Sequence, residues 1–182
     1  MFPGHDRGVL DHPGPWADPD AAPASSATTT TTMTGLPALQ GRVLGTSDWF
    51  AVTQAGVDAF ADATHDHEWI RVDVARARAE SPFGGPIAHG HLTLSHLAPM
   101  VGQVLQVTDA AMTVNYGLDR VRFPAPVPVG ARIRMTATLA DVHEVEGGLQ
   151  LRLAAVIEAE GTAKPVCVAE PVFRSYRELS TR

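Results

Sequence analysis

The sequence predicts an α+β fold in which an antiparallel sheet packs on one long helix. Apolar residues recur at helical spacing in the first part of the chain, most clearly over residues 89–105, and alternate with polar residues from about residue 112 onward. Helices followed by a run of strands are typical of this fold class. The chain has 182 residues, of which 45% are hydrophobic and 19% charged, and this length and composition suit one globular domain.

The first 33 residues differ in composition from the rest of the chain. They contain prolines and glycines that break helices, and they include five consecutive threonines, Thr28 to Thr32. A segment without apolar periodicity cannot bury enough surface to offset the entropy lost on ordering. We therefore expect residues 1–33 to form a disordered tail and residues 34–182 to form a single domain.

The domain is expected to begin with a strand over about residues 41–50 and a helix over about residues 54–64. Thr53 precedes the helix and is a residue type that caps helix N-termini. Residues 64–86 are rich in polar residues, glycine and proline, which predicts a long ordered loop. Within that loop, Asp73 is expected to cap a short turn.

Residues from His89 to about Leu105 predict the long helix. Their apolar side chains cover much of the helix circumference, as expected when a sheet wraps around a helix. These apolar positions are Leu92, Leu94, Leu97, Met100, Val101, Val104 and Leu105. Pro99 lies inside the segment and is expected to kink it.

Four strands are expected after the helix. Period-two alternation is clearest in the second and third of them, and glycine-containing turns separate the runs. The four ranges are about 112–123, 132–139, 149–158 and 165–174. Pro171, in the last strand, fits an edge strand or a bulge better than a regular central position, because proline has no N–H to donate.

Charge and cysteine content exclude several classes of protein. A formal net charge of −6 argues against a nucleic-acid-binding protein, which would present a basic face. No stretch approaches the roughly 18 consecutive apolar residues of a membrane span. The single cysteine, Cys167, rules out an intramolecular disulfide and cysteine-based zinc frameworks. We therefore expect a cytoplasmic protein with no metal site, no nucleic-acid partner and no membrane contact.

Two motifs carry the candidate site. The first is Thr64-His-Asp-His-Glu-Trp-Ile-Arg-Val-Asp73, and the second is Pro82-Phe-Gly-Gly-Pro-Ile-Ala-His-Gly90. A third segment, residues 115–130, follows them. In this order and spacing the motifs resemble the MaoC-like dehydratase domain, a family that includes (R)-specific enoyl-CoA hydratases and proteins similar to nodulation protein N. The resemblance covers about residues 41–174.

The resemblance implies a hotdog fold, in which an antiparallel sheet wraps a central helix, here about His89–Leu105. Family members pair as dimers or carry two such halves in one chain. This chain has room for one half, so a homodimer is implied. The implied reaction is hydration of trans-2-enoyl thioesters, or the reverse dehydration of (R)-3-hydroxyacyl thioesters, carried by coenzyme A or a carrier protein. No cofactor is implied beyond the pantetheine thioester of the substrate.

The resemblance also assigns site residues. In the family, an aspartate and a histidine five residues apart bind the water, and Asp66 matches that aspartate. The glycine N–H of the His-Gly pair donates to the thioester oxygen as negative charge develops there, and Gly90 matches that glycine. The turn that contains Gly85 is expected to bring the loop against the helix. We group Gly90, His89 and Gly85 as substrate-binding residues.

Arg71 stands where the family has its histidine, five residues after Asp66. An arginine stays protonated at physiological pH, so Arg71 cannot be a general base. In one interpretation another histidine supplies the missing group, and His91, directly after Gly90, is the most interesting substitute. The catalytic candidates are then Asp66, Arg71 and His91.

Two other interpretations of Arg71 stay open. The scaffold could carry altered chemistry, an isomerisation or a specialised biosynthetic dehydration, in which Arg71 binds a carboxylate or stabilises an enolate. Alternatively, the protein is a non-catalytic subunit that binds acyl thioesters.

Overall fold

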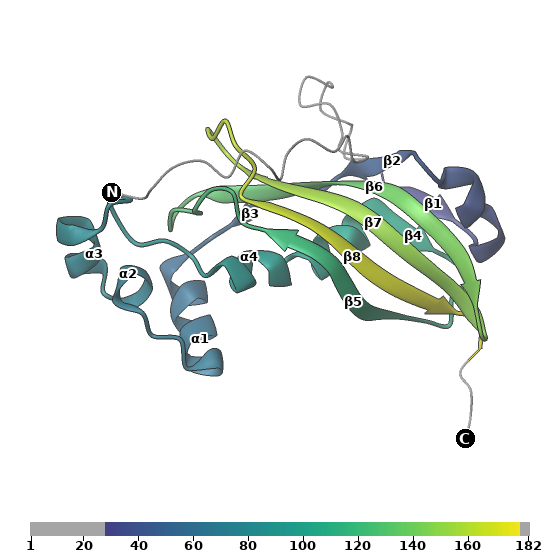
Figure 1. Cartoon of the computed structure of the whole chain (residues 1–182), viewed down its shortest axis with the longest axis horizontal. Helices are drawn as coiled ribbons and strands as arrows, with labels where there is room; N and C mark the ends of the chain where they lie inside the picture. The colour runs from purple at the N-terminus through teal and green to yellow at the C-terminus, as the bar shows by residue number, and fades with distance from the viewer. Residues whose placement is uncertain (1–27, 179–182) are drawn as a thin grey trace.

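The computed structural model describes residues 28–178. Its main feature is a six-stranded sheet, in which all neighbouring strands are antiparallel. Figure 1 shows the long strands curving side by side across the molecule. Across the sheet they lie in the order β2 (Val43–Thr46), β6 (Arg132–Val145), β7 (Gly148–Ala159), β8 (Cys167–Tyr176) and β5 (Met112–Arg122), and β3 (Phe50–Ala51) also pairs with β6. The predicted strands are therefore present, and β5 is an edge strand.

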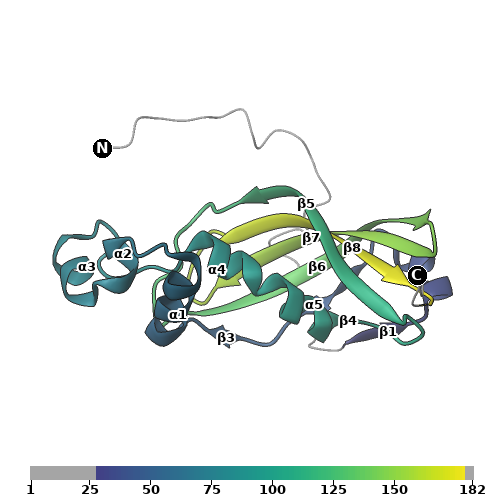
Figure 2. The same ribbon diagram turned by 90° about the horizontal axis from the view of Figure 1, so that it is seen from below.

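The expected long helix is present but divided. It consists of α4 (Gly90–Ser95) and α5 (Leu97–Val104), which run across one face of the sheet in Figure 2. The break at His96 follows from Pro99, which has no N–H to donate to the carbonyl of Ser95 and whose ring crowds that carbonyl. The kink expected at Pro99 therefore falls one turn before it.

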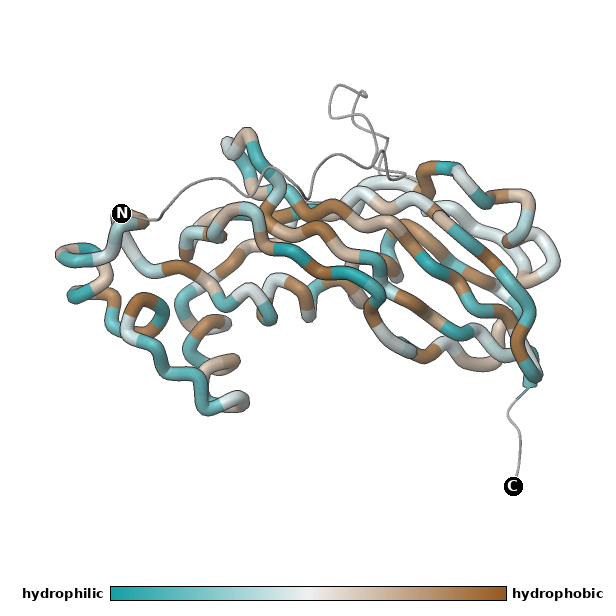
Figure 3. The backbone as a smooth tube through the Cα atoms, viewed as in Figure 1, coloured by the Kyte–Doolittle hydropathy of each residue, from teal (hydrophilic) through white to brown (hydrophobic). Residues whose placement is uncertain are grey.

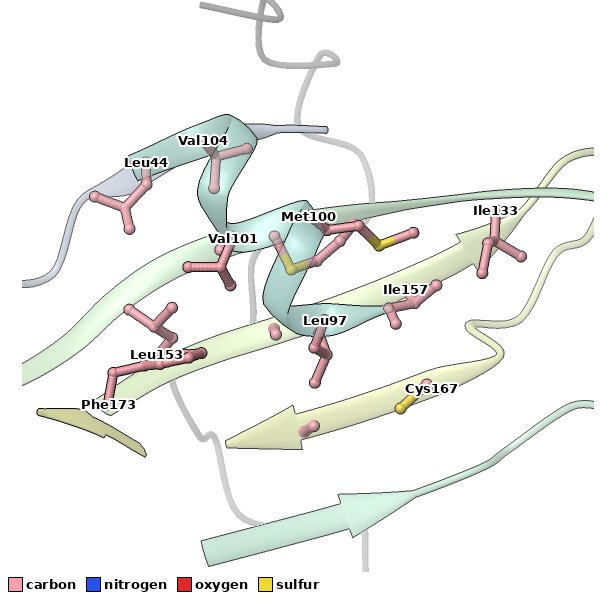
Figure 4. Packing of buried hydrophobic residues seen from close by; sticks show 14 of the residues in the cluster. Leu44, Leu97, Met100, Val101, Val104, Ile133, Leu153, Ile157, Cys167 and Phe173 are labelled. Atoms are coloured by element: carbon pink, nitrogen blue, oxygen red, sulfur yellow. The ribbon is translucent and has the colours of Figure 1, made fainter. Parts of the chain in front are cut away.

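Alternation along the strands builds the core. One face of β6 and β7 is buried against α5, and Figure 3 shows hydrophobic and hydrophilic positions following each other along the strands. Figure 4 shows side chains of α5 meeting those of the sheet. The side chains from the two layers include Leu97, Met100 and Val104 of α5 and Ile133, Met135, Leu139, Leu153 and Ile157 of the sheet, all buried. Cys167 lies in the same core, and burial raises the pKa of its thiol to about 12.

A helical lobe projects beyond one end of the sheet (Figures 1 and 2). It contains α1 (Gln54–Thr64), α2 (Trp69–Val72) and α3 (Val74–Glu80). Thr53 caps α1 by accepting a hydrogen bond from the N–H of Gly56, and Asp73 caps α3 by accepting one from Arg76, as the sequence predicts. The expected long loop over residues 64–86 is corrected in one respect, because α2 and α3 lie within it.

The N-terminal boundary also differs from the prediction of a disordered tail up to residue 33. Thr29–Thr31 form β1, which pairs in parallel with β4 (Leu105–Val107), and a 3₁₀ helix, η1 (Met33–Leu39), follows. Met33 and Leu36 are buried in the core, which holds this segment against the domain. Threonine is β-branched and suits a strand, a preference that the repetitive composition conceals. Residues 1–27 of the expected tail lie outside the described part of the chain.

Pro171 lies in β8, between β7 and β5, rather than on an edge strand. The pairing of β5 with β8 shifts register between Leu118 and Val121, next to Pro171, so the bulge alternative is the correct one. None of the helices within residues 28–178 is long and apolar enough to cross a membrane.

Candidate active site

Two segments from the two sequence motifs meet between the helical lobe and the start of α4. Three hydrogen bonds join them: Arg71 Nη1 donates to the carbonyl of Ala88 at 3.0 Å, His89 Nε2 donates to the carbonyl of Asp66 at 2.9 Å, and the N–H of Ile87 donates to Ile70 at 3.1 Å. Each segment thus supplies a side chain that bonds the backbone of the other. The structure therefore brings Asp66, Arg71 and His89 together.

The carboxylate of Asp66 is half-exposed and accepts no hydrogen bond from residues 28–178. Its Oδ2 lies 3.7 Å from Arg71 Nε and 3.7 Å from His89 Nε2. Both distances exceed that of a hydrogen bond, so both donors lie close without taking up the carboxylate lone pairs. The backbone of Asp66 is fixed while its carboxylate stays available to a ligand.

Arg71 occupies the place that the resemblance gives to a histidine. Its side chain is 20% exposed and lines a cavity of about 300 Å³. One of its donors binds Ala88, whereas Nε is buried and has no hydrogen-bond partner among the described residues. Gln54, at the start of α1, donates from its side chain to the carbonyl of Arg71 at 2.8 Å and so ties α2 to α1. The guanidinium is thus bonded through Nη1, while its buried Nε–H has no partner among the described residues.

His89 is only 2% exposed and packs on Phe60 of α1, with ring centroids 5.0 Å apart. Because a carbonyl oxygen can only accept, the bond to Asp66 places a proton on Nε2. The other ring nitrogen, Nδ1, is buried without a partner among the described residues. This arrangement is a structural support for the Asp66 loop, and the substrate-binding role of His89 stays a prediction.

Gly90 begins α4 on the wall of the same cavity. Its N–H finds no acceptor among residues 28–178, as expected for the first amide of a helix. A Cβ at this position would come within 3.0 Å of the ring of Phe123, so a side chain here would displace the ring. Gly85 lies in the preceding turn and is not among the lining residues. Its assignment to substrate binding stays a prediction.

His91, which directly follows Gly90 in the chain, is exposed. Its ring packs on Phe123 with centroids 5.9 Å apart. Within the described residues, no hydrogen bond or ion pair joins His91 to Asp66 or Arg71. Its role as substitute for the missing histidine stays a prediction.

A second cavity, of about 320 Å³, lies along α5 and was not found from the sequence. Helix residues Ala98, Val101 and Gly102 form one wall and face side chains of the sheet. The sheet contributes three apolar side chains, Leu151, Leu153 and Phe173, and three polar ones, Thr113, Asn115 and Ser175. Small residues four apart on one helix face, Ala98 and Gly102, are the sequence signal that could have indicated it.

The sequence and the fold of this chain are similar to those of known proteins. The family model described as "MaoC like domain" matches residues 36–160. The 3-hydroxyacyl-thioester dehydratase Z of Mycobacterium tuberculosis is 49% identical over 140 residues, covering 76% of this chain and 92% of that protein. Nodulation protein N of Rhizobium meliloti is 42% identical over 139 residues, covering 75% of this chain and 86% of that protein.

The fold matches that of solved hydratases. The R-hydratase PhaJ1 from Pseudomonas aeruginosa superposes with a TM-score of 0.60 at 20% identity, covering 72% of this chain and 79% of that one. The expected hotdog fold and the family resemblance are thereby confirmed.

Proposed function

The chain belongs to the MaoC-like dehydratase family, and from that premise we propose that it interconverts (R)-3-hydroxyacyl and trans-2-enoyl thioesters. Dehydration removes a proton from the α-carbon and the hydroxyl group from the β-carbon, while negative charge develops on the thioester oxygen. The reaction therefore needs a group that takes and returns protons, together with a donor for that oxygen.

One observation carries the proposal. The free carboxylate of Asp66 and the unpaired N–H of Gly90 come from the two segments that the hydrogen bonds join, and the cavity wall includes Gly90 and Arg71. In this arrangement Asp66 moves protons and the N–H of Gly90 binds the thioester oxygen.

The apolar cavity along α5 fits the acyl chain of the substrate. Val101, Leu151, Leu153 and Phe173 contribute apolar wall to it, and such a lining suits a hydrocarbon chain. The carrier is coenzyme A or a carrier protein, which would present the same pantetheine thioester.

A homodimer completes the proposal. β5 is an edge strand of 11 residues, one side of which pairs with no other strand of residues 28–178, and such an edge is a template for pairing with another strand. Large apolar side chains stay exposed on and beside it, namely Met112, Tyr116, Leu118 and Phe123. Pairing of β5 with its copy would cover them.

The expectation that Arg71 stands where the family has a histidine favours two other functions. The site could catalyse an isomerisation or a specialised biosynthetic dehydration, or the protein could bind acyl thioesters without turning them over. All three proposals predict thioester binding, and they differ in whether the enoyl group is hydrated.

The decisive experiment follows the loss of enoyl-thioester absorbance on short and medium trans-2-enoyl-CoA and on the same acyl groups attached to a carrier protein. The wild type is expected to turn over at least one of them, and Asp66→Asn to lower kcat by about 10²–10⁴-fold. Glu68→Gln is the matched control, because Glu68 is an exposed carboxylate on the same loop that makes no side-chain cap bond. Thioester binding by the wild type without hydration of any substrate would contradict the proposal and favour a non-catalytic subunit.

A further inference from the structure

We propose that Arg71 Nε holds the oxygen atom that is lost or gained as water, and that Asp66 alone performs both proton transfers. The inference rests on the proposed function and concerns how a site without the expected histidine carries it out. It makes Arg71 a residue that contacts the reacting oxygen, and it makes the proton chemistry depend on one carboxylate.

The buried donor at Arg71 Nε is the first observation behind it. A buried N–H without an acceptor is costly and uncommon in folded proteins, and it indicates a site that a ligand or water completes. The second observation is the gap of 3.7 Å between this nitrogen and Asp66 Oδ2. A polar pair at that distance is suited to bridging by one oxygen, which accepts from Nε and donates to the carboxylate. A water molecule or a 3-hydroxyl group offers both functions in one atom.

The proton balance closes with Asp66 alone. In dehydration, the carboxylate removes the α-proton, and the C–H electron pair moves into the enolate whose oxygen is bound at Gly90. The carboxylic acid of Asp66 then gives this proton to the 3-hydroxyl as the carbon–oxygen bond breaks with its electrons on oxygen, and water leaves. The elimination of the proton and the hydroxyl therefore takes place on one face of the substrate. Hydration follows the same steps in reverse, and Asp66 ends each cycle as a carboxylate.

Among the described residues, Arg71 and His89 approach the carboxylate of Asp66, each at 3.7 Å, and neither is hydrogen-bonded to it. From α2, Arg71 stays protonated. From the segment before α4, His89 uses its Nε2 hydrogen in the bond to the backbone carbonyl of Asp66. The lobe contributes His67, which pairs with Asp62 of α1 at 2.9 Å. His65 and Glu68 flank Asp66 in the chain and are exposed.

This arrangement predicts a pH profile without a histidine ionisation. Because no imidazole takes part in proton transfer, kcat/KM is expected to show no imidazole ionisation through the neutral range. A site with an imidazole as the second proton-transfer group would show a further ionisation near neutral pH, because the ordinary pKa of histidine lies near 6.5.

The test measures kcat, KM and pH dependence for the wild type, Arg71→Ala, Arg71→Lys, Arg71→His and Arg76→Ala on the thioester that the wild type turns over best. Arg71→Ala is expected to lower kcat by about 10–100-fold with a smaller change in KM, because it removes a charged donor to the reacting oxygen. Arg71→Lys keeps the charge but not the Nε donor and is expected to stay slow. Arg71→His is expected to add an ionisation near neutral pH. Arg76, an exposed arginine paired with Glu80, is the matched control, and Arg76→Ala is expected to keep the wild-type profile.

The unfolding midpoint of each variant separates a failure to fold from a loss of chemistry. A wild-type profile with an ionisation near neutral pH that disappears in His91→Asn or His89→Gln would overturn the inference and leave the proposed function intact. Wild-type rates in Arg71→Ala would overturn it as well. Absence of turnover in the wild type would overturn the proposed function itself.

Discussion

The sheet with α5 and the helical lobe with the site differ in how completely their buried polar groups are hydrogen-bonded. In the sheet region, apolar side chains of β6 and β7 pack on α5 and polar groups are paired in strand ladders. In the lobe and the segment before α4, the described residues leave three buried side-chain atoms unpaired, namely Gln54 Oε1, Arg71 Nε and His89 Nδ1. All three lie within the same small network around Arg71 and Asp66. The difference shows that stability is concentrated in one region, whereas the unsatisfied groups that a ligand can use are concentrated in the other.

The largest effect on stability is expected in the sheet. Leu139→Ala removes a fully buried side chain of β6 that is not among the lining residues of either cavity. Loss of burial and the cavity left behind should lower the free energy of unfolding by about 2–5 kcal/mol. Turnover per folded molecule should stay at the wild-type level. Denaturant unfolding and kcat measure the two quantities, and Val43→Ala, which shortens an exposed side chain, is the control. Loss of turnover in the folded fraction would show that the two regions are coupled.

Gly90→Ala tests the site region, where an effect on turnover and not on stability is expected. The added Cβ would lie 3.0 Å from the ring of Phe123, so the ring must move and the cavity must narrow. Displacement of this order at the reacting centre is expected to lower kcat by about 10–100-fold. The unfolding midpoint should change little, because alanine favours helix more than glycine does. A wild-type rate in this variant would remove Gly90 from the thioester oxygen site.

The smallest effect is expected at the start of α1. Thr53→Ala removes the hydroxyl that accepts from the N–H of Gly56 at 3.1 Å, at a cost of about 1 kcal/mol in the free energy of unfolding. Thr53→Ser keeps the hydroxyl and should keep most of that stability. Equal losses in both variants would mean that the methyl group, and not the cap, is responsible. Denaturant unfolding monitored by circular dichroism is the measurement.

Much of the sheet region could be predicted from the sequence, because alternation and turn residues are local signals. The strands around Ile133 and Ile157 were recognisable in this way, and so was the cap at Thr53. A kink was predicted at Pro99, whereas the helix breaks at His96. The difference arises because proline disturbs the carbonyl four residues before it. The short helices α2 and α3 are too short to show a period.

Less of the site could be predicted. The motifs indicated that Asp66, Arg71 and Gly90 belong to one site, and Arg71 stood out because its charge differs from what the resemblance requires. The bonds from Arg71 to Ala88 and from His89 to Asp66 span 17 and 23 residues, and they exist only once the two segments have met in the folded chain. The unpaired atoms and the cavity along α5 are likewise properties of packing. No local pattern in the sequence encodes them.

Turnover is assigned to the site and stability to the sheet. The most direct test measures turnover and unfolding on the same preparations of wild type, Asp66→Asn and Leu139→Ala. The dehydration of a 3-hydroxyacyl thioester and the unfolding midpoint are recorded for each. Asp66→Asn is predicted to lose turnover while its midpoint stays near that of the wild type, and Leu139→Ala is predicted to show the reverse. Turnover by folded Asp66→Asn at the wild-type rate would contradict the account.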